Sequence, residues 1–231
     1  MREYDRNKPL IAIHIPKTAG TSVRAIMKKW YGDNLLLNYY VEATATMPEK
    51  YDIAALHSWQ NPVVVYGHFN RTRNFGIEHY YPQVKQFITI LRDPFERVVS
   101  AYFYMHKNIG DWLGNSRAPF GDLRKHLLKS RGNMLNHFPE KVTMENFRNI
   151  IDSRFIEVGL MEYLDESMHR IATKLGQKYT TGDIPHLNHA KKTTDIPYEI
   201  KQEFMQQHQL EYAVYHYVLS RYESTVTAKN K

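Results

Sequence analysis

Short runs of apolar residues, separated by polar or turn-forming positions, divide this chain into predicted strands. The run Leu10–Ile13 stops shortly before Pro16, which has no N–H group to donate to a neighbouring strand. Continuous apolar runs of this length are typical of strands covered on both faces, as in a parallel sheet. Further predicted strands span Leu35–Tyr40, Val63–His68, Gln86–Leu91 and Phe155–Leu160.

Helical patterns follow most of these strands. They cover Ser22–Trp30, a segment that begins at Pro94 and continues to His106, Leu164–Leu175, and Glu199–Glu223, which reads as one long amphipathic helix. The stretch Phe69–Tyr81 is expected to be a loop. Strands that alternate with helices predict an α/β fold, in which helices flank a central parallel sheet, and we expect a single domain over residues 1–231.

Composition agrees with a folded enzyme. The chain has 231 residues, of which 42% are hydrophobic and 13% aromatic, and this argues against disorder. No apolar run approaches the about 18–20 residues of a membrane span, and the first residues lack the apolar core of a signal peptide. Because the sequence also contains no cysteine, we expect a soluble protein of a reducing cytoplasm.

The formal net charge of +7 favours anionic partners. A nucleotide or an anionic acceptor would suit this charge. Nucleic acid is not expected as a partner, because the sequence shows no helix-turn-helix, zinc-finger or RNA-recognition signature.

The segment Pro16–Ser22 joins the first predicted strand to the first predicted helix. Such a turn points free backbone N–H groups toward one spot, and the helix dipole adds positive potential there. Lys17 adds a mobile cation, and Thr18, Thr21 and Ser22 add hydroxyl donors. The loop is not a Walker A motif, because no Gly-Lys pair ends it. It therefore predicts a site for a nucleotide 5′-phosphate group; the alternative is a plain connection with a capping Thr or Ser.

A second segment ends another strand with charge. Arg92 follows the strand Gln86–Leu91, at the carboxyl end where open α/β sheets bind ligands. Pro94 suits the first turn of the next helix, with Asp93 as its N-cap, and Ser100 follows two turns later. Arg92 and Ser100 could bind a second phosphate. The alternative is a local ion pair between Arg92 and Asp93.

These two segments resemble the cofactor motifs of the sulfotransferase superfamily, most closely its carbohydrate branch, which includes heparan-sulfate 2-O-sulfotransferase-like enzymes. With no anchor and no cysteine, the chain is similar to a soluble, bacterial-type member. The resemblance implies that 3′-phosphoadenosine 5′-phosphosulfate (PAPS) is the co-substrate and 3′-phosphoadenosine 5′-phosphate (PAP) the product. It assigns the 5′-phosphosulfate to Lys17, Thr18, Ala19, Gly20, Thr21 and Ser22. It assigns the 3′-phosphate to Arg92 and Ser100.

The resemblance also points to His68 in the element Gly67-His68. Uronyl 2-O-sulfotransferase-like enzymes carry a Gly-His at the corresponding place, with the histidine as proposed base. Imidazole titrates near neutrality and can take the proton of an acceptor hydroxyl. Lys17 would stabilise the charge that grows on the leaving phosphate. The alternative is an ordinary hydrogen-bonded histidine.

One further loop, Gly182–Thr194, is similar to a family element that closes over the cofactor. By that likeness, Asn188 and Lys191 approach the 3′-phosphate; the alternative is a basic surface loop. His186 and His189 in this loop have no supporting ligands for a zinc site, and the mechanism needs no metal.

The expected function is the transfer of a sulfuryl group from PAPS to a hydroxyl acceptor, expected to be a carbohydrate. Two other hypotheses about the function remain open. One is a P-loop-type nucleotide kinase or NTPase, and the other is a non-catalytic protein that binds a nucleotide or a glycan.

Overall fold

The computed structural model describes residues 1–112, 123–130, 132–184 and 196–229. Its centre is a five-stranded parallel sheet with the strand order β2-β3-β1-β4-β5. The strands are β1 (Leu10–Ile13), β2 (Leu35–Asn38), β3 (Val64–Gly67), β4 (Phe87–Leu91) and β5 (Phe155–Leu160). All five were predicted from the apolar runs.

The strand order places three functional loops beside one another. β1 lies at the centre of the sheet, where Ile11 pairs with Val65 of β3 and with Phe87 of β4. Because the strands are parallel, the segments after β1, β3 and β4 leave the sheet at the same edge. Backbone pairing continues past the strand ends, since the N–H of His14 donates to the Gly67 carbonyl at 2.8 Å.

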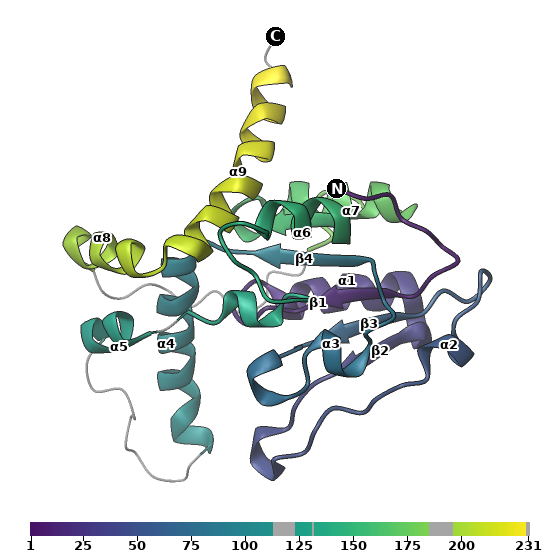
Figure 1. Cartoon of the computed structure of the whole chain (residues 1–231), viewed down its shortest axis with the longest axis horizontal. Coiled ribbons are helices and arrows are strands. Elements are labelled where there is room, and N and C mark those ends of the chain that lie inside the picture. The colour runs from purple at the N-terminus through teal and green to yellow at the C-terminus, as the bar shows by residue number, and fades with distance from the viewer. Residues whose placement is uncertain (113–122, 131, 185–195, 230–231) are drawn as a thin grey trace.

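Helices cover both faces of the sheet (Figure 1). The α-helices are α1 (Gly20–Tyr31), α2 (Ile53–Leu56), α3 (Ile77–Tyr80), α4 (Pro94–Trp112), α5 (Leu123–Lys129), α6 (Phe147–Arg154), α7 (Leu164–Leu175), α8 (Tyr198–Gln207) and α9 (Gln209–Lys229). Helices α1 and α7 pack on one face, through Val23 and Ile171, whereas α6 and α9 pack on the other, through Ile150 and Val218.

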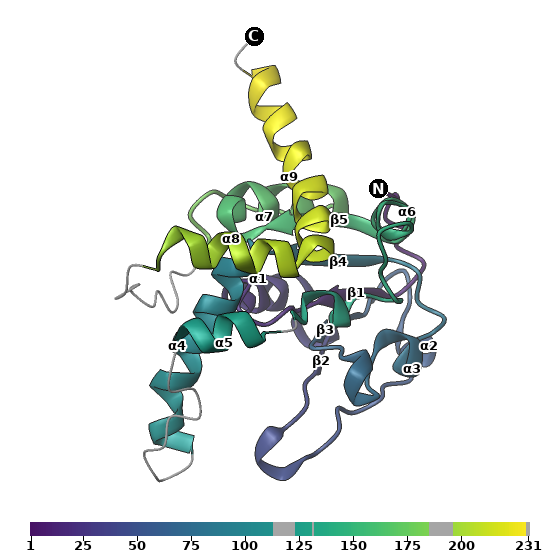
Figure 2. The same cartoon turned by 60° about the vertical axis from the view of Figure 1, so that its left-hand side comes forward.

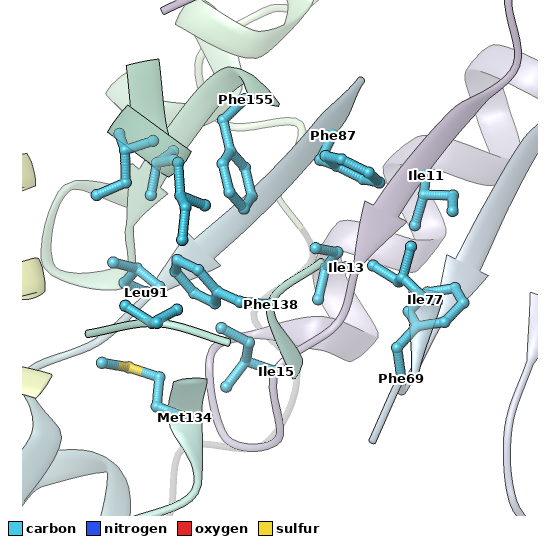
Figure 3. Packing of buried hydrophobic residues seen from close by; sticks show 14 of the residues in the cluster. Ile11, Ile13, Ile15, Phe69, Ile77, Phe87, Leu91, Met134, Phe138 and Phe155 are labelled. Carbon is cyan, nitrogen blue, oxygen red and sulfur yellow. The ribbon is translucent and has the colours of Figure 1, made fainter. Parts of the chain in front are cut away.

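Two layers of buried apolar side chains sandwich the sheet. Figure 3 shows the layer on the α6 and α9 face, in which Ile11 and Ile13 of β1 and Phe87 of β4 pack beside Phe138 and Phe155. A third, smaller cluster of buried side chains joins α4, α5, α8 and α9 at the edge where β4 ends. Figure 2 shows α4, α5 and α8 lying beside one another there. This cluster fixes α4 beside the functional edge.

The C-terminal helix was predicted wrongly as one element. The structure divides it into α8 and α9 at His208, whose N–H donates to the carbonyls of Phe204 and Met205. The His208 ring is buried against the ring of Phe204, with ring centres 4.0 Å apart. The backbone leaves helical geometry at His208, with a φ of −118° and a ψ of 35°, although the residue is neither a glycine nor a proline. The expected loop Phe69–Tyr81 also differs, because it contains α3 and a 3-10 turn.

Candidate functional site

A cleft of about 910 Å³ opens at the carboxyl edge of the sheet. It brings together most of the predicted site residues, which come from three separate segments of the chain: Lys17, Ala19, Gly20, Thr21, Ser22, His68, Arg92 and Ser100. Asn188 and Lys191 lie outside the described residues. The convergence follows from the parallel sheet, since the loops after β1, β3 and β4 meet at this edge.

The loop after β1 is shaped to hold an anion. Lys17 and Ala19 adopt left-handed backbone conformations, with φ angles of 70° and 61°. Each such angle at a residue other than glycine costs about 1–2 kcal/mol, and strain of this kind gathers at ligand clamps. Ala19 is the N-cap of α1 without a side-chain cap, and the first turn holds no acidic residue. The Thr or Ser cap of a plain connection is therefore not found.

The hydroxyl groups of this loop point in different directions. Thr18 is buried, and its hydroxyl donates to the Ile15 carbonyl at 2.8 Å. Its side chain therefore secures the loop, and only its backbone N–H is left for a ligand. Thr21 and Ser22 line the cleft.

Two cations from different motifs meet in the cleft. Nη1 of Arg92 donates to the Lys17 carbonyl at 3.3 Å. Burial lowers the pKa of Lys17, and the positive charge of Arg92 lowers it further. A bound anion would relieve this repulsion between the two cations. Asp93 takes another role than pairing with Arg92: it caps α4 through the Glu96 N–H and lies 3.6 Å from Lys201.

The geometry of His68 leaves one ring nitrogen for proton transfer. Nδ1 lies 2.6 Å from the His14 carbonyl oxygen, and because a carbonyl only accepts, Nδ1 carries the hydrogen. Nε2 of the neutral ring then has a free lone pair. Burial lowers the pKa of His68, which favours this neutral form at pH 7. The rings of His14 and His137 lie nearby, with centres 4.2 Å and 6.0 Å away.

Sequence reasoning missed several residues that also line the cleft. One wall is the segment Met161–Glu166 after β5, and its place at the same sheet edge was the available signal. Glu162 accepts the Asp93 N–H at 2.9 Å, which joins this wall to the Arg92 motif. Tyr104 lies one turn after Ser100 on α4, and His14 lies two residues before the anion loop, Pro16–Ser22.

A sequence model described as "Sulfotransferase family" matches residues 4–156. The chain belongs to the sulfotransferase family. The match includes the anion loop, His68, and the Arg92 motif. The protein is thus a sulfotransferase, an enzyme that transfers a sulfuryl group.

Two solved structures resemble this sulfotransferase. Mouse sulfotransferase SULT7A1 complexed with PAP has a TM-score of 0.50 and 13% identity, over 94% of this chain and 90% of that chain. This likeness shows a shared fold. A sulfotransferase from Alicyclobacillus acidocaldarius has a TM-score of 0.48 and 13% identity, over 92% of this chain and 96% of that chain. No curated protein sequence matches at a significant level.

Among the described residues of this sulfotransferase, no helix is both long and apolar enough to span a membrane. In the same residues, no group of three or more His, Cys, Asp or Glu side chains is placed to hold a metal ion.

Proposed function

We propose that this sulfotransferase uses PAPS as its sulfuryl donor and a carbohydrate hydroxyl as its acceptor. The observation that carries the donor assignment is the hydrogen bond from Arg92 to the Lys17 carbonyl, because it joins two cationic motifs across one cleft. PAPS carries anionic groups on both the 5′ and the 3′ side of its ribose. Its binding site therefore needs a cationic group at each of these two positions. The cleft volume of about 910 Å³ falls within the range of nucleotide-sized sites.

Each anionic group of PAPS then has its own contacts in the cleft. The backbone N–H groups of residues 18–22 and the Lys17 ammonium hold the 5′-phosphosulfate, helped by the positive end of the α1 dipole. Residue 20 must be a glycine, because a Cβ there would collide with the His14 ring. Arg92 and Ser100 bind the 3′-phosphate from the start of α4. Asn188 and Lys191 would complete that side of the site.

His68 and Lys17 have separate roles in the transfer. The acceptor oxygen attacks sulfur while Nε2 of His68 takes its proton, so that the new O–S bond forms as the S–O bond to the 5′-phosphate breaks. The leaving phosphate oxygen gains negative charge, which the Lys17 ammonium stabilises. The His14 carbonyl keeps His68 in the tautomer that this step requires.

The carbohydrate acceptor rests on the element Gly67-His68, which resembles that of the uronyl 2-O-sulfotransferase-like enzymes. His68 lines the same cleft as the donor loop, so a sugar hydroxyl placed at His68 would face the sulfuryl group. The test is a screen of sulfate transfer from PAPS to uronic-acid polysaccharides, neutral glycans and simple phenols, read by mass spectrometry. Transfer to phenols alone would contradict the acceptor class.

The donor assignment is tested by calorimetric titration with PAP, and separately with ATP and Mg²⁺. We expect micromolar binding of PAP and little binding of ATP. Arg92→Ala should weaken PAP binding about tenfold or more, as loss of a charged hydrogen-bond donor does. The matched control is Arg148→Ala, which removes an exposed arginine of α6. A preference for ATP with Mg²⁺ would instead favour a kinase or NTPase.

A further inference from the structure

His14 is held in one orientation inside the cleft. A Cβ atom at residue 20 would lie only 1.6 Å from His14 Nε2 and 2.1 and 2.2 Å from Cδ2 and Cε1. Near-equal distances to the two flanking carbons place the face of the ring, near Nε2, against the Gly20 backbone. The ring centre also lies 4.2 Å from that of His68. His14 therefore occupies the space between the proposed base and the anion loop.

The hydrogen bonds of Tyr39 decide which nitrogen of His14 carries hydrogen. Nδ1 of His14 lies 2.9 Å from the Tyr39 hydroxyl, and Arg24 is a second hydrogen-bond partner of that hydroxyl. Tyr66 is a further partner of Tyr39, and its own hydroxyl donates to the Gly20 carbonyl at 2.7 Å. The Tyr39 O–H can therefore donate either to the Tyr66 oxygen or to Nδ1 of His14. Burial lowers the pKa of His14, which keeps the ring neutral. When the Tyr39 O–H donates to Nδ1, the hydrogen of neutral His14 is on Nε2.

In this tautomer, Nε2–H is a donor to which no hydrogen-bond partner is assigned among the described residues. It belongs to a residue that lines the cleft, and it lies in the plane of a ring whose face rests on Gly20. This donor lies between Gly20 of the anion loop and His68, the two sides of the proposed transfer. Donors preorganised in this way are worth most where they meet developing charge.

We propose that His14 is a further catalytic residue, whose Nε2–H donates a hydrogen bond to an oxygen of the sulfuryl group. This inference rests on the proposed PAPS donor. The sulfuryl oxygens carry negative charge before, during and after transfer. Throughout, they are stabilised by a hydrogen-bond donor that is neutral or cationic. His14 keeps its proton, because the acceptor proton goes to His68 and the leaving phosphate is met by Lys17. No bond to His14 forms or breaks.

The test compares two nucleotides that differ only in the sulfuryl group. Calorimetry gives the dissociation constants of PAPS and PAP, without acceptor, for the wild type and for His14→Leu and His14→Gln. Leucine fills the space without a donor, and the glutamine amide restores an N–H near the position of Nε2. We expect His14→Leu to weaken PAPS about tenfold while PAP changes less than about twofold, as for one charged hydrogen bond. Glutamine should recover most of the PAPS affinity.

A variant of Tyr39 tests the tautomer. Tyr39→Phe removes the hydroxyl that donates to Nδ1 in the proposed tautomer, and it should lower PAPS affinity by a smaller factor than His14→Leu, again without affecting PAP. Equal losses of PAPS and PAP in all variants would show a purely structural role and overturn the proposal. An unchanged ratio of the two affinities in His14→Leu would overturn it as well. If the wild type binds neither nucleotide, the proposed donor itself is wrong and this inference falls with it.

Discussion

The ammonium nitrogen of Lys17 lies 3.8 Å from the centre of the Tyr104 ring. The two residues come from the anion loop and from α4, so this contact closes one side of the cleft across two elements. A cation over an exposed aromatic ring gains only about 0.5–1 kcal/mol. The contact is therefore strong enough to hold Lys17 in place and weak enough to be exchanged for an anionic ligand.

Replacing Tyr104 tests whether this contact competes with the nucleotide. In Tyr104→Leu the Lys17 ammonium loses its resting partner, so PAP should bind as tightly as in the wild type, or up to about fivefold more tightly. Tyr104→Phe keeps the aromatic face and is the matched control. Calorimetry with PAP measures both. Binding more than about tenfold weaker in the leucine variant would mean that Tyr104 holds the nucleotide itself.

Lys17 should be needed for turnover. Lys17→Ala removes the cation that meets the leaving phosphate, and the rate of PAP release from PAPS should fall about a hundredfold or more. Water can serve as the acceptor in this assay, with sulfate as the second product. Lys28→Ala is the control, because Lys28 lies on α1, the helix that follows the loop of Lys17, and pairs with Asp33 at 2.9 Å. A loss of less than about threefold in Lys17→Ala would assign the transition-state charge to another donor.

The pH dependence of turnover should report His68. The base must be neutral, so the rate falls as the pH drops through the pKa of His68. Since burial lowers that pKa below its ordinary value of 6.5, the acid limb should lie below pH 6.5. His14 and His137 are also shifted downward, and the pKa of His137 falls to about 3.

A variant separates His68 from its two histidine neighbours. His68→Gln should lower the rate about a hundredfold or more and remove the acid limb from the remaining activity. The pH profile of PAP release is measured for both proteins. An acid limb that persists unchanged in His68→Gln would assign it to a group other than His68.

The sheet and the two motifs could be predicted because their signals are local. Apolar runs gave the strands, and a parallel sheet brings strand ends to one edge, so Lys17 and Arg92 were expected together before any contact was seen. The break at His208 could not be predicted, since neither a glycine nor a proline marks it in the sequence. The place of His14 depends on Gly20 and Tyr39, which no sequence spacing relates.

The last prediction concerns Gly67, which fixes the position of His68 through the backbone. A Cβ atom at residue 67 would lie 1.9 Å from the carbonyl oxygen of Asn38 and 2.9 Å from its Cα. These are backbone atoms at the end of the neighbouring strand β2, in register with Gly67, and they cannot turn away as a side chain could. Gly67→Ala must therefore separate β2 from β3 just before the proposed base.

We expect Gly67→Ala to lower the free energy of unfolding by about 2–3 kcal/mol, as overpacking against fixed atoms does. Gly32→Ala is the control: nothing lies within 4 Å of its Cβ position, but its φ of +53° still strains an alanine. That strain alone costs about 1–2 kcal/mol. Urea denaturation of both variants gives the comparison. If Gly67→Ala is the less destabilised of the two, the strand end yields more easily than this packing implies, and Gly67 does not fix the position of His68.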